Sequence, residues 1–259
     1  MRFGISSVIY ESEFKNLAKK TKGLDKLYLK YVDIIVNFAL KHKFRIIELS
    51  GLLDNISEIL PALIDEIKKK IEPFEEISFH LPVKFRPIEE TKVSISAIKE
   101  LGARVIVYHP DYMSLPFKTE KERNENILEL ISFCKKHDLM LCLENLPLEV
   151  KNFHTPEEFD FYIEKGAFFT LDTGHAVICD VDPLSFLERF GKKVKNIHLQ
   201  SGFRGKPDVH YVIGDGEFDY MNFFKKLKYI EYDGLLILEL LSEKNAIDSL
   251  NQLKKSRLF

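Results

Sequence analysis

Short apolar runs alternate with longer amphipathic segments from one end of the chain to the other. The apolar runs are predicted to be strands: Phe3–Val8, Arg45–Leu49, Ile77–Leu81, Arg104–His109, Met140–Glu144, Phe168–Asp172, Val194–Leu199 and Leu235–Leu240. Apolar residues at helical spacing predict helices over Leu27–Leu40, Ile56–Ile71, Lys92–Leu101, Glu122–Lys136, Pro156–Glu164, Pro183–Phe190, Tyr220–Tyr229 and Glu243–Lys254. Eight strand–helix repeats are typical of a parallel sheet covered by helices.

The length of the chain and the absence of linker sequences favour a closed barrel over an open sheet. The chain has 259 residues and no linker rich in Pro, Gly or Ser, and about 250 residues are typical of an eightfold β/α barrel. An open doubly wound sheet is the alternative, but it favours a Gly-rich phosphate turn after its first strand. Residues 6–10, Ser-Ser-Val-Ile-Tyr, do not form such a turn, so no nucleotide cofactor is expected. We predict a single (β/α)8 TIM barrel in which residues 1–259 form one domain.

Seven of the predicted strands carry an acidic residue or a histidine at or beside their C-terminal end. These residues are Glu48, His80, His109, Glu144, Asp172, His198 and Glu239. Because side chains alternate along a strand, the residue two positions earlier also faces the barrel axis. Those residues are Ile46, Ser78, Val107, Cys142, Thr170, Asn196 and Ile237. Side chains at the C-terminal strand ends of barrel enzymes are typically catalytic, so this ring of residues predicts an active site at the C-terminal end (the mouth) of the barrel.

Each member of the ring has an ordinary structural interpretation when it is taken alone. A strand-end histidine commonly packs through a hydrogen bond, Glu48 could pair with a basic residue of a neighbouring helix, and Asp172 could cap the next helix. Together they indicate more, because buried carboxylates need partners and no Lys or Arg occupies an equivalent inward position. A divalent cation would neutralise them, so the ring predicts a metal site in which Asp172 can both cap and ligate.

Composition narrows the class of protein further. The formal net charge is −2, which disfavours a strongly basic nucleic-acid-binding protein. Cys134, Cys142 and Cys179 are scattered, which argues against a disulfide framework and fits a reducing cytoplasm. The first eight residues read as a strand rather than a signal peptide, and no apolar run approaches the roughly 18 residues of a membrane span. We expect a cytoplasmic protein with no membrane partner; no feature marks an oligomer interface.

Five motifs on the later strands resemble a known superfamily. They are Glu144-Asn145-Leu146-Pro147, Leu171-Asp172-Thr173-Gly174-His175-Ala176, Ile197-His198-Leu199, Asp208-Val209-His210 and Ile213-Gly214-Asp215-Gly216-Glu217-Phe218-Asp219. Because of the order and spacing of these motifs, the whole chain resembles the xylose-isomerase-like barrels. That superfamily holds sugar-phosphate isomerases and epimerases together with apurinic/apyrimidinic (AP) endonucleases of the endonuclease IV type (AP endonuclease family 2). The motifs are specific for the superfamily and do not separate its branches.

Resemblance to the isomerase and epimerase branch implies one divalent ion, Mn²⁺, Mg²⁺, Co²⁺ or Zn²⁺. Its ligands would be Glu144, Asp172, His198 and Glu239. The implied reaction is proton transfer beside a carbonyl of a small sugar or sugar phosphate, through a metal-stabilised enediolate. Glu144 and Glu239 would move the protons from opposite sides. The implied substrate-binding residues are Glu48, His80, His109, His175 and His210.

Resemblance to the endonuclease branch implies three zinc ions that share nine ligands. Every ligand has a matching residue type here: His80, His109, Glu144, Asp172, His175, His198, Asp208, His210 and Glu239. Glu144 would bridge two metals, and the cluster would activate a hydroxide against a phosphodiester at an abasic site in DNA.

Three departures from the endonuclease pattern favour the sugar branch. His80 is followed by Leu-Pro-Val-Lys-Phe-Arg-Pro instead of a Tyr-containing loop, Leu199-Gln200-Ser201 replaces Asn-Asp-Ser or Asn-Glu-Ser, and Gly174 replaces a Cys. Glu48 also resembles the sugar enzymes. Lys84, Arg86, Arg204 and Lys206 are candidates for binding DNA phosphates, but they serve equally well for one phosphorylated sugar. We expect a metal-dependent sugar isomerase or epimerase, with the DNA phosphodiesterase as the alternative and a non-catalytic binding barrel as the third interpretation.

Overall fold

Eight parallel strands close into a barrel in the order β1 to β8. The computed structural model describes residues 2–112 and 119–256. The strands are β1 (Phe3–Ser6), β2 (Ile46–Ser50), β3 (Glu76–His80), β4 (Val105–Tyr108), β5 (Met140–Glu144), β6 (Phe168–Asp172), β7 (Val194–Leu199) and β8 (Leu235–Leu238). All eight pairings are parallel, including β1 with β8. The predicted (β/α)8 TIM barrel is confirmed.

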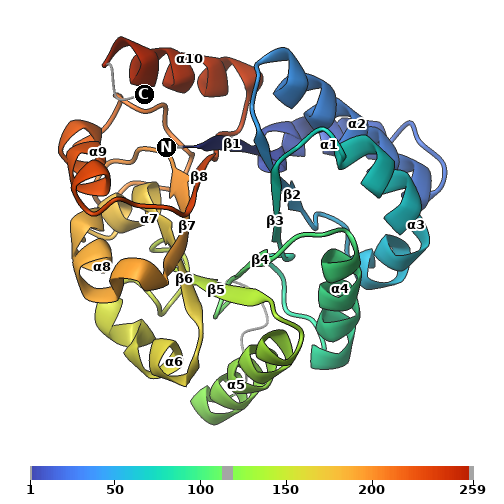
Figure 1. Ribbon diagram of the computed structural model, residues 1–259, viewed down its shortest axis with the longest axis horizontal. Coiled ribbons are helices and arrows are strands. Elements are labelled where there is room, and N and C mark those ends of the chain that lie inside the picture. Colours follow the sequence, from blue (N-terminus) through green and yellow to red (C-terminus); the bar gives the residue numbers. More distant parts are fainter. Residues whose placement is uncertain (1, 113–118, 257–259) are drawn as a thin grey trace.

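Helices surround the barrel (Figure 1). They are α1 (Glu11–Ala18), α2 (Leu24–Lys41), α3 (Ile56–Ile71), α4 (Ile88–Glu100), α5 (Glu120–Lys136), α6 (Asp160–Lys165), α7 (Thr173–Ile178), α8 (Pro183–Phe190), α9 (Tyr220–Tyr229) and α10 (Glu243–Lys255). Short 3-10 helices add η1 (Ser7–Tyr10), η2 (Pro156–Phe159) and η3 (Gly191–Lys193). Within the described ranges, no helix is both long and apolar enough to cross a membrane.

The predicted elements were wrong mainly where local capping ends an element. The first strand stops at Ser6 instead of continuing to Val8. The Ser6 side chain accepts a hydrogen bond from the Val8 amide (3.4 Å) and caps η1 there. The helix predicted over Pro156–Glu164 is divided into η2 and α6. Helices α1 and α7 were not predicted; α7 has only 6 residues, too few for a periodic signal.

The barrel interior has an apolar floor and a polar upper layer. The floor is a small cluster of buried residues, Ile46, Val105, Cys142, Leu235 and Ile237, which is separate from the main core between strands and helices. Strand β1 faces this floor with Gly4, where a Cβ atom would lie 2.6 Å from Ile237 Cδ1. Because the floor is filled, the acidic and imidazole side chains above it face the C-terminal mouth.

A cluster of four phenylalanines fixes β6, the strand that ends in Asp172. Phe169 stacks on Phe186 of α8 with 5.2 Å between ring centroids, and Phe159 and Phe190 pack edge-on or tilted against Phe169. Aromatic pairs of this kind add about 0.5–1.5 kcal/mol beyond the area they bury. The outer face of β6 is therefore anchored to its helices while its inner face carries the site.

Candidate metal centre and active site

Four buried side chains meet at the mouth of the barrel. Glu144, Asp172 and His198 stand at or near the ends of β5, β6 and β7, and Glu239 follows β8 by one residue. Their candidate ligand atoms all lie within 4.8 Å of one another, and none of the four residues is more than 5% exposed. The sequence prediction that these four residues converge is therefore realised in the tertiary structure.

His198 lies at the centre of this group. Its Nδ1 atom is 2.8 Å from Glu144 Oε1, 2.9 Å from Glu239 Oε2 and 4.0 Å from Asp172 Oδ2. Its Nε2 atom points the other way and lies 3.0 Å from Glu48 Oε1. The ring thus presents Nδ1 to the three carboxylates of the mouth and Nε2 to the barrel interior.

Asp172 caps helix α7 and is also one of the four residues of the tetrad, so it can both cap and ligate, as the sequence predicted. Its Oδ1 accepts a hydrogen bond from the His175 amide (2.7 Å), and its Oδ2 accepts one from Gln200 Nε2 (2.8 Å). The Asn145 side chain clamps the Asp172 backbone by accepting from its amide (2.8 Å) and donating to its carbonyl (2.9 Å). A carboxylate held from two sides has a fixed orientation, which a ligand needs.

Three histidines are fixed in one tautomer by backbone carbonyls. His80 Nδ1 is 2.7 Å from the Leu81 carbonyl, His175 Nδ1 is 2.9 Å from the Asn145 carbonyl, and His210 Nδ1 is 2.9 Å from the Glu239 carbonyl. A carbonyl can only accept, so each Nδ1 donates its proton and each neutral ring offers the Nε2 lone pair to the mouth. This arrangement is typical of histidines that bind metals.

A second donor group adjoins the tetrad. His175 Nε2 and His210 Nε2 lie 3.0 and 3.3 Å from Asp208 Oδ2, and the candidate ligand atoms of these three residues lie within 4.8 Å of one another. His80 Nε2 and His109 Nε2 each lie 3.1 Å from Glu144 Oε2. The structure therefore brings together all nine residues that the resemblance to the endonuclease branch implied as ligands.

The buried carboxylates and imidazoles shift one another's pKa values. Burial raises the pKa of Asp172 to about 6. Burial also disfavours the charged form of Glu239, but the nearby His198 outweighs it and lowers the pKa of Glu239 to about 2. For His210, burial is outweighed by Asp208, which raises the pKa of His210 to about 9. The site holds a dense set of interacting charges that a divalent cation could neutralise in place of protons.

No Lys or Arg in the part of the chain that the structure describes offsets this negative charge. Among residues 2–112 and 119–256, no Lys or Arg forms an ion pair with Glu48, Glu144, Asp172, Asp208 or Glu239. The chemistry of this oxygen and nitrogen donor set fits Mn²⁺, Mg²⁺, Co²⁺ or Zn²⁺.

Three of the four basic residues considered for phosphate binding are engaged by the protein. Lys84 pairs with Asp54 (3.2 Å), the buried Arg86 donates to the Leu53 carbonyl (2.8 Å), and Arg204 pairs with Asp180 and Glu217. Lys206 lies on an exposed part of the loop after β7.

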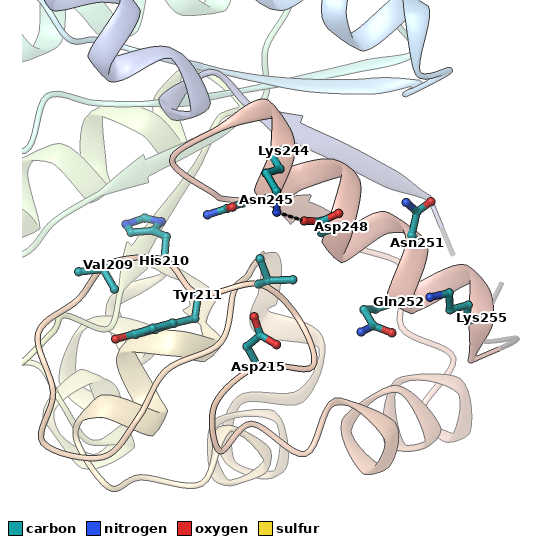
Figure 2. A pocket seen from close by; sticks show the side chains of 11 residues that line it. Val209, His210, Tyr211, Asp215, Lys244, Asn245, Asp248, Asn251, Gln252 and Lys255 are labelled. Carbon is teal, nitrogen blue, oxygen red and sulfur yellow. Dashed lines mark hydrogen bonds and ion pairs between the residues drawn. The ribbon is translucent and has the colours of Figure 1, made fainter.

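A polar groove opens beside His210. It has a volume of about 490 Å³ and runs between residues 209–215 of the β7–α9 loop and helix α10. Figure 2 shows His210 at one end of the groove and Asn245, near the start of α10, extending its amide toward the same end. Lys244 and Asp248 pair with each other on the helix (2.7 Å). His210 belongs both to this groove and to the second donor group.

Sequence reasoning missed the residues that orient the site. Asn145 and Gln200 were noticed only as parts of motifs, and both are fully buried against Asp172. The signal that could have found Gln200 is Gly174, where a Cβ atom would lie 2.6 Å from Gln200 Cδ. Glu48 was expected to contact substrate, but it has no exposed surface and lies beneath His198.

Comparison with known proteins agrees with the fold. Residues 36–256 match the family described as xylose isomerase-like TIM barrel. An uncharacterized protein of Methanocaldococcus jannaschii is 25% identical over 98% of this chain and 89% of its own length. A D-tagatose 3-epimerase-like protein superposes with a TM-score of 0.75 at 23% identity, covering 99% of this chain and 97% of that one. A D-psicose 3-epimerase crystallised in the presence of D-fructose superposes with a TM-score of 0.70 at 17% identity, covering 99% and 98%.

Proposed function

Since this chain belongs to the xylose isomerase-like TIM barrel family, we propose that it is a divalent-metal-dependent isomerase or epimerase of a small sugar or sugar phosphate. The observation that carries the proposal is the buried tetrad of Glu144, Asp172, His198 and Glu239, with their ligand atoms within 4.8 Å of one another. The tetrad would hold one ion. Bound there, Mn²⁺, Mg²⁺, Co²⁺ or Zn²⁺ would supply Lewis acidity toward the substrate oxygens beside the reacting carbon.

Glu144 and Glu239 supply the proton transfer in this proposal. They stand at β5 and just after β8, so they reach the mouth from either side of β6 and β7. One carboxylate removes the proton from the carbon beside the carbonyl, and the other delivers a proton to the opposite face, which inverts that carbon. Delivery to the neighbouring carbon gives an isomer instead. His198 Nδ1 lies within 3 Å of both carboxylates, so the three groups could hold the same ion.

The remaining histidines orient the substrate. His80, His109, His175 and His210 present ring nitrogens to the mouth and are suited to hydrogen bonds with sugar hydroxyls. The groove beside His210 accommodates the end of the substrate that does not react. Holding the reacting carbon between the two carboxylates in this way lowers the entropic part of the barrier.

Hydrogen exchange at carbon tests the proposal across many sugars. The protein, loaded with Mn²⁺ or Co²⁺, is incubated in D₂O with a panel of ketoses, aldoses and their phosphates, and deuterium at the carbon beside the carbonyl is measured by NMR. We expect exchange with at least one sugar, its loss in Glu239→Gln, and full activity in the control Glu100→Gln, an exposed carboxylate on α4. No exchange with any sugar of the panel under any of the candidate metals would refute the proposal.

A zinc phosphodiesterase acting at abasic sites is the second candidate. The observation in its favour is the second donor group, His175, Asp208 and His210, together with the contacts of His80 and His109 to Glu144. Metal analysis of the purified protein separates the two candidates, since one ion fits the tetrad and three ions require all nine residues. Incision of an abasic duplex in the presence of zinc would support this second function, and an intact duplex would remove it.

A further inference from the structure

A buried polar network lies directly beneath the tetrad. It consists of Glu48 on β2, Ser78 on β3, Asn196 on β7 and the lower edge of the His198 ring. Glu48, Ser78, Asn196 and His198 have no exposed surface. A carboxylate placed in such a position must have partners, because an unpaired buried charge is strongly destabilising.

The two oxygens of Glu48 have different partners. Oε2 accepts hydrogen bonds from Ser78 Oγ (2.8 Å) and Asn196 Nδ2 (2.9 Å), which fix the plane of the carboxylate. Oε1 lies 3.0 Å from His198 Nε2 but, within the described ranges, no hydrogen bond to it is formed in this geometry, so the contact is electrostatic. The Asn196 amide nitrogen Nδ2, which donates to Glu48 Oε2, is also 3.0 Å from His198 Nε2, so Glu48 and Asn196 both lie beneath the imidazole.

We propose that Glu48 is a positioning residue: its negative charge beside His198 Nε2 favours the tautomer protonated at Nε2 and leaves the Nδ1 lone pair free for a metal ion. This inference rests on the proposed metal-dependent function. A neutral imidazole carries one proton, so the acceptor at Nε2 decides which nitrogen can ligate. The three carboxylates of the tetrad all face Nδ1, so an ion held by them would meet His198 at this nitrogen and would need its lone pair.

The same geometry distinguishes this role from substrate binding. Glu48 is covered by the His198 ring above and lies over the apolar floor that includes Ile46, two residues earlier on β2. A sugar at the mouth would meet His198 and the tetrad carboxylates before it reached Glu48. Glu48 therefore acts on the metal through His198, and removing its charge should change metal affinity in the absence of any substrate.

The test measures binding of Mn²⁺ alone, by electron paramagnetic resonance of the free ion, to the full-length protein without sugar. Loss of a carboxylate that orients a ligating histidine typically lowers metal affinity by about 10–100-fold, so we expect that loss in Glu48→Gln. Ser78→Ala, which keeps the carboxylate but removes one of its donors, should lower the affinity by a smaller factor. Asp111→Asn is the matched control, because Asp111 is also buried but pairs with Arg123 and Asn152 away from the tetrad.

The possible outcomes separate this inference from the function on which it rests. Weaker binding in Glu48→Gln with unchanged binding in Asp111→Asn supports the positioning role. Equal affinities in the wild type and Glu48→Gln overturn it, as does an equal loss in Asp111→Asn, and either result leaves the metal-dependent function standing. A wild-type protein that binds no Mn²⁺, Co²⁺ or Zn²⁺ refutes the metal-dependent function itself. If Glu48→Gln does not fold, the comparison of Ser78→Ala with the wild type decides: unchanged affinity overturns the role.

Discussion

Gly174 and Gln200 form a steric pair whose energetics can be worked out from the structure. Gly174 lies in the first turn of α7 and does not have a positive φ, so alanine would suit its backbone better by about 1 kcal/mol. An alanine Cβ would, however, lie 2.6 Å from Gln200 Cδ and 2.7 Å from Gln200 Cγ. Ordinary contact begins at 3.4 Å, so the buried Gln200 side chain would have to move by close to 1 Å.

That movement breaks the 2.8 Å hydrogen bond from Gln200 to Asp172. A hydrogen bond to a charged group contributes about 1.5–3 kcal/mol, and the better helix propensity of alanine offsets about 1 kcal/mol of the loss. We expect Gly174→Ala to lower the free energy of unfolding by about 0.5–2 kcal/mol. In a Gln200→Ala background the clash is absent, so the same change should be neutral or stabilising by up to about 1 kcal/mol.

Urea denaturation of the wild type, both single variants and the double variant, without added metal, gives the coupling energy. We expect about 1.5–3 kcal/mol, from the hydrogen bond that each single variant loses. Additive effects, within about 0.5 kcal/mol, would refute the steric argument. The pair also explains two departures from the endonuclease pattern at once, because a cysteine at position 174 carries the same Cβ and is incompatible with Gln200 over Asp172.

Four further expectations follow from the site. Glu239→Gln should reduce deuterium incorporation into the substrate at least 100-fold, as expected for a lost acid–base group, and retention of exchange would exclude Glu239 from proton transfer. In EDTA, the free energy of unfolding should fall between pH 6.5 and 9. The pKa of His210 is raised from 6.5 to about 9, so the stabilisation from its charged form is lost over that interval. A free energy of unfolding that stays constant or rises there contradicts the assignment. Asn245→Ala should raise KM and leave kcat within twofold, since Asn245 faces the groove rather than the tetrad; a large fall in kcat with unchanged KM would place Asn245 in the reaction itself. Cys134, whose pKa is raised to about 12 by burial, should resist iodoacetamide at pH 8 until urea is added, and rapid alkylation of the folded protein would show that it is accessible.

The sequence alone predicted the barrel because its signals are local and repeated. Each predicted strand is present, and three predicted helices, Ile56–Ile71, Pro183–Phe190 and Tyr220–Tyr229, have the observed bounds. The period of two along a strand also placed Ile46 and Cys142 in the floor beneath Glu48 and Glu144. These features depend on residues within one element, which is the range over which a hydrophobic pattern carries information.

The convergence of the candidate ligands was predictable for the same reason. Parallel strands of a closed barrel all end at one face, so any polar residue at a strand end must approach the others. Asp208 and His210 were identified only through a family resemblance, because they lie on the loop after β7, whose course no periodicity fixes. The structure brings them to the mouth through the pairing of Ser201 with Tyr211 and the contact of His210 Nδ1 with the Glu239 carbonyl.

What only the tertiary structure decided is how each polar side chain is oriented. The sequence determined an eightfold barrel whose mouth is lined by carboxylates and imidazoles, since alternation and strand order suffice for that result. It could not show that His198 presents Nδ1 to the mouth and Nε2 to Glu48, or that Gly174 makes space for Gln200 over Asp172. Those relations join residues far apart in the chain through single hydrogen bonds and contacts of a few ångströms. They depend on exact distances, which a pattern of residue types does not contain.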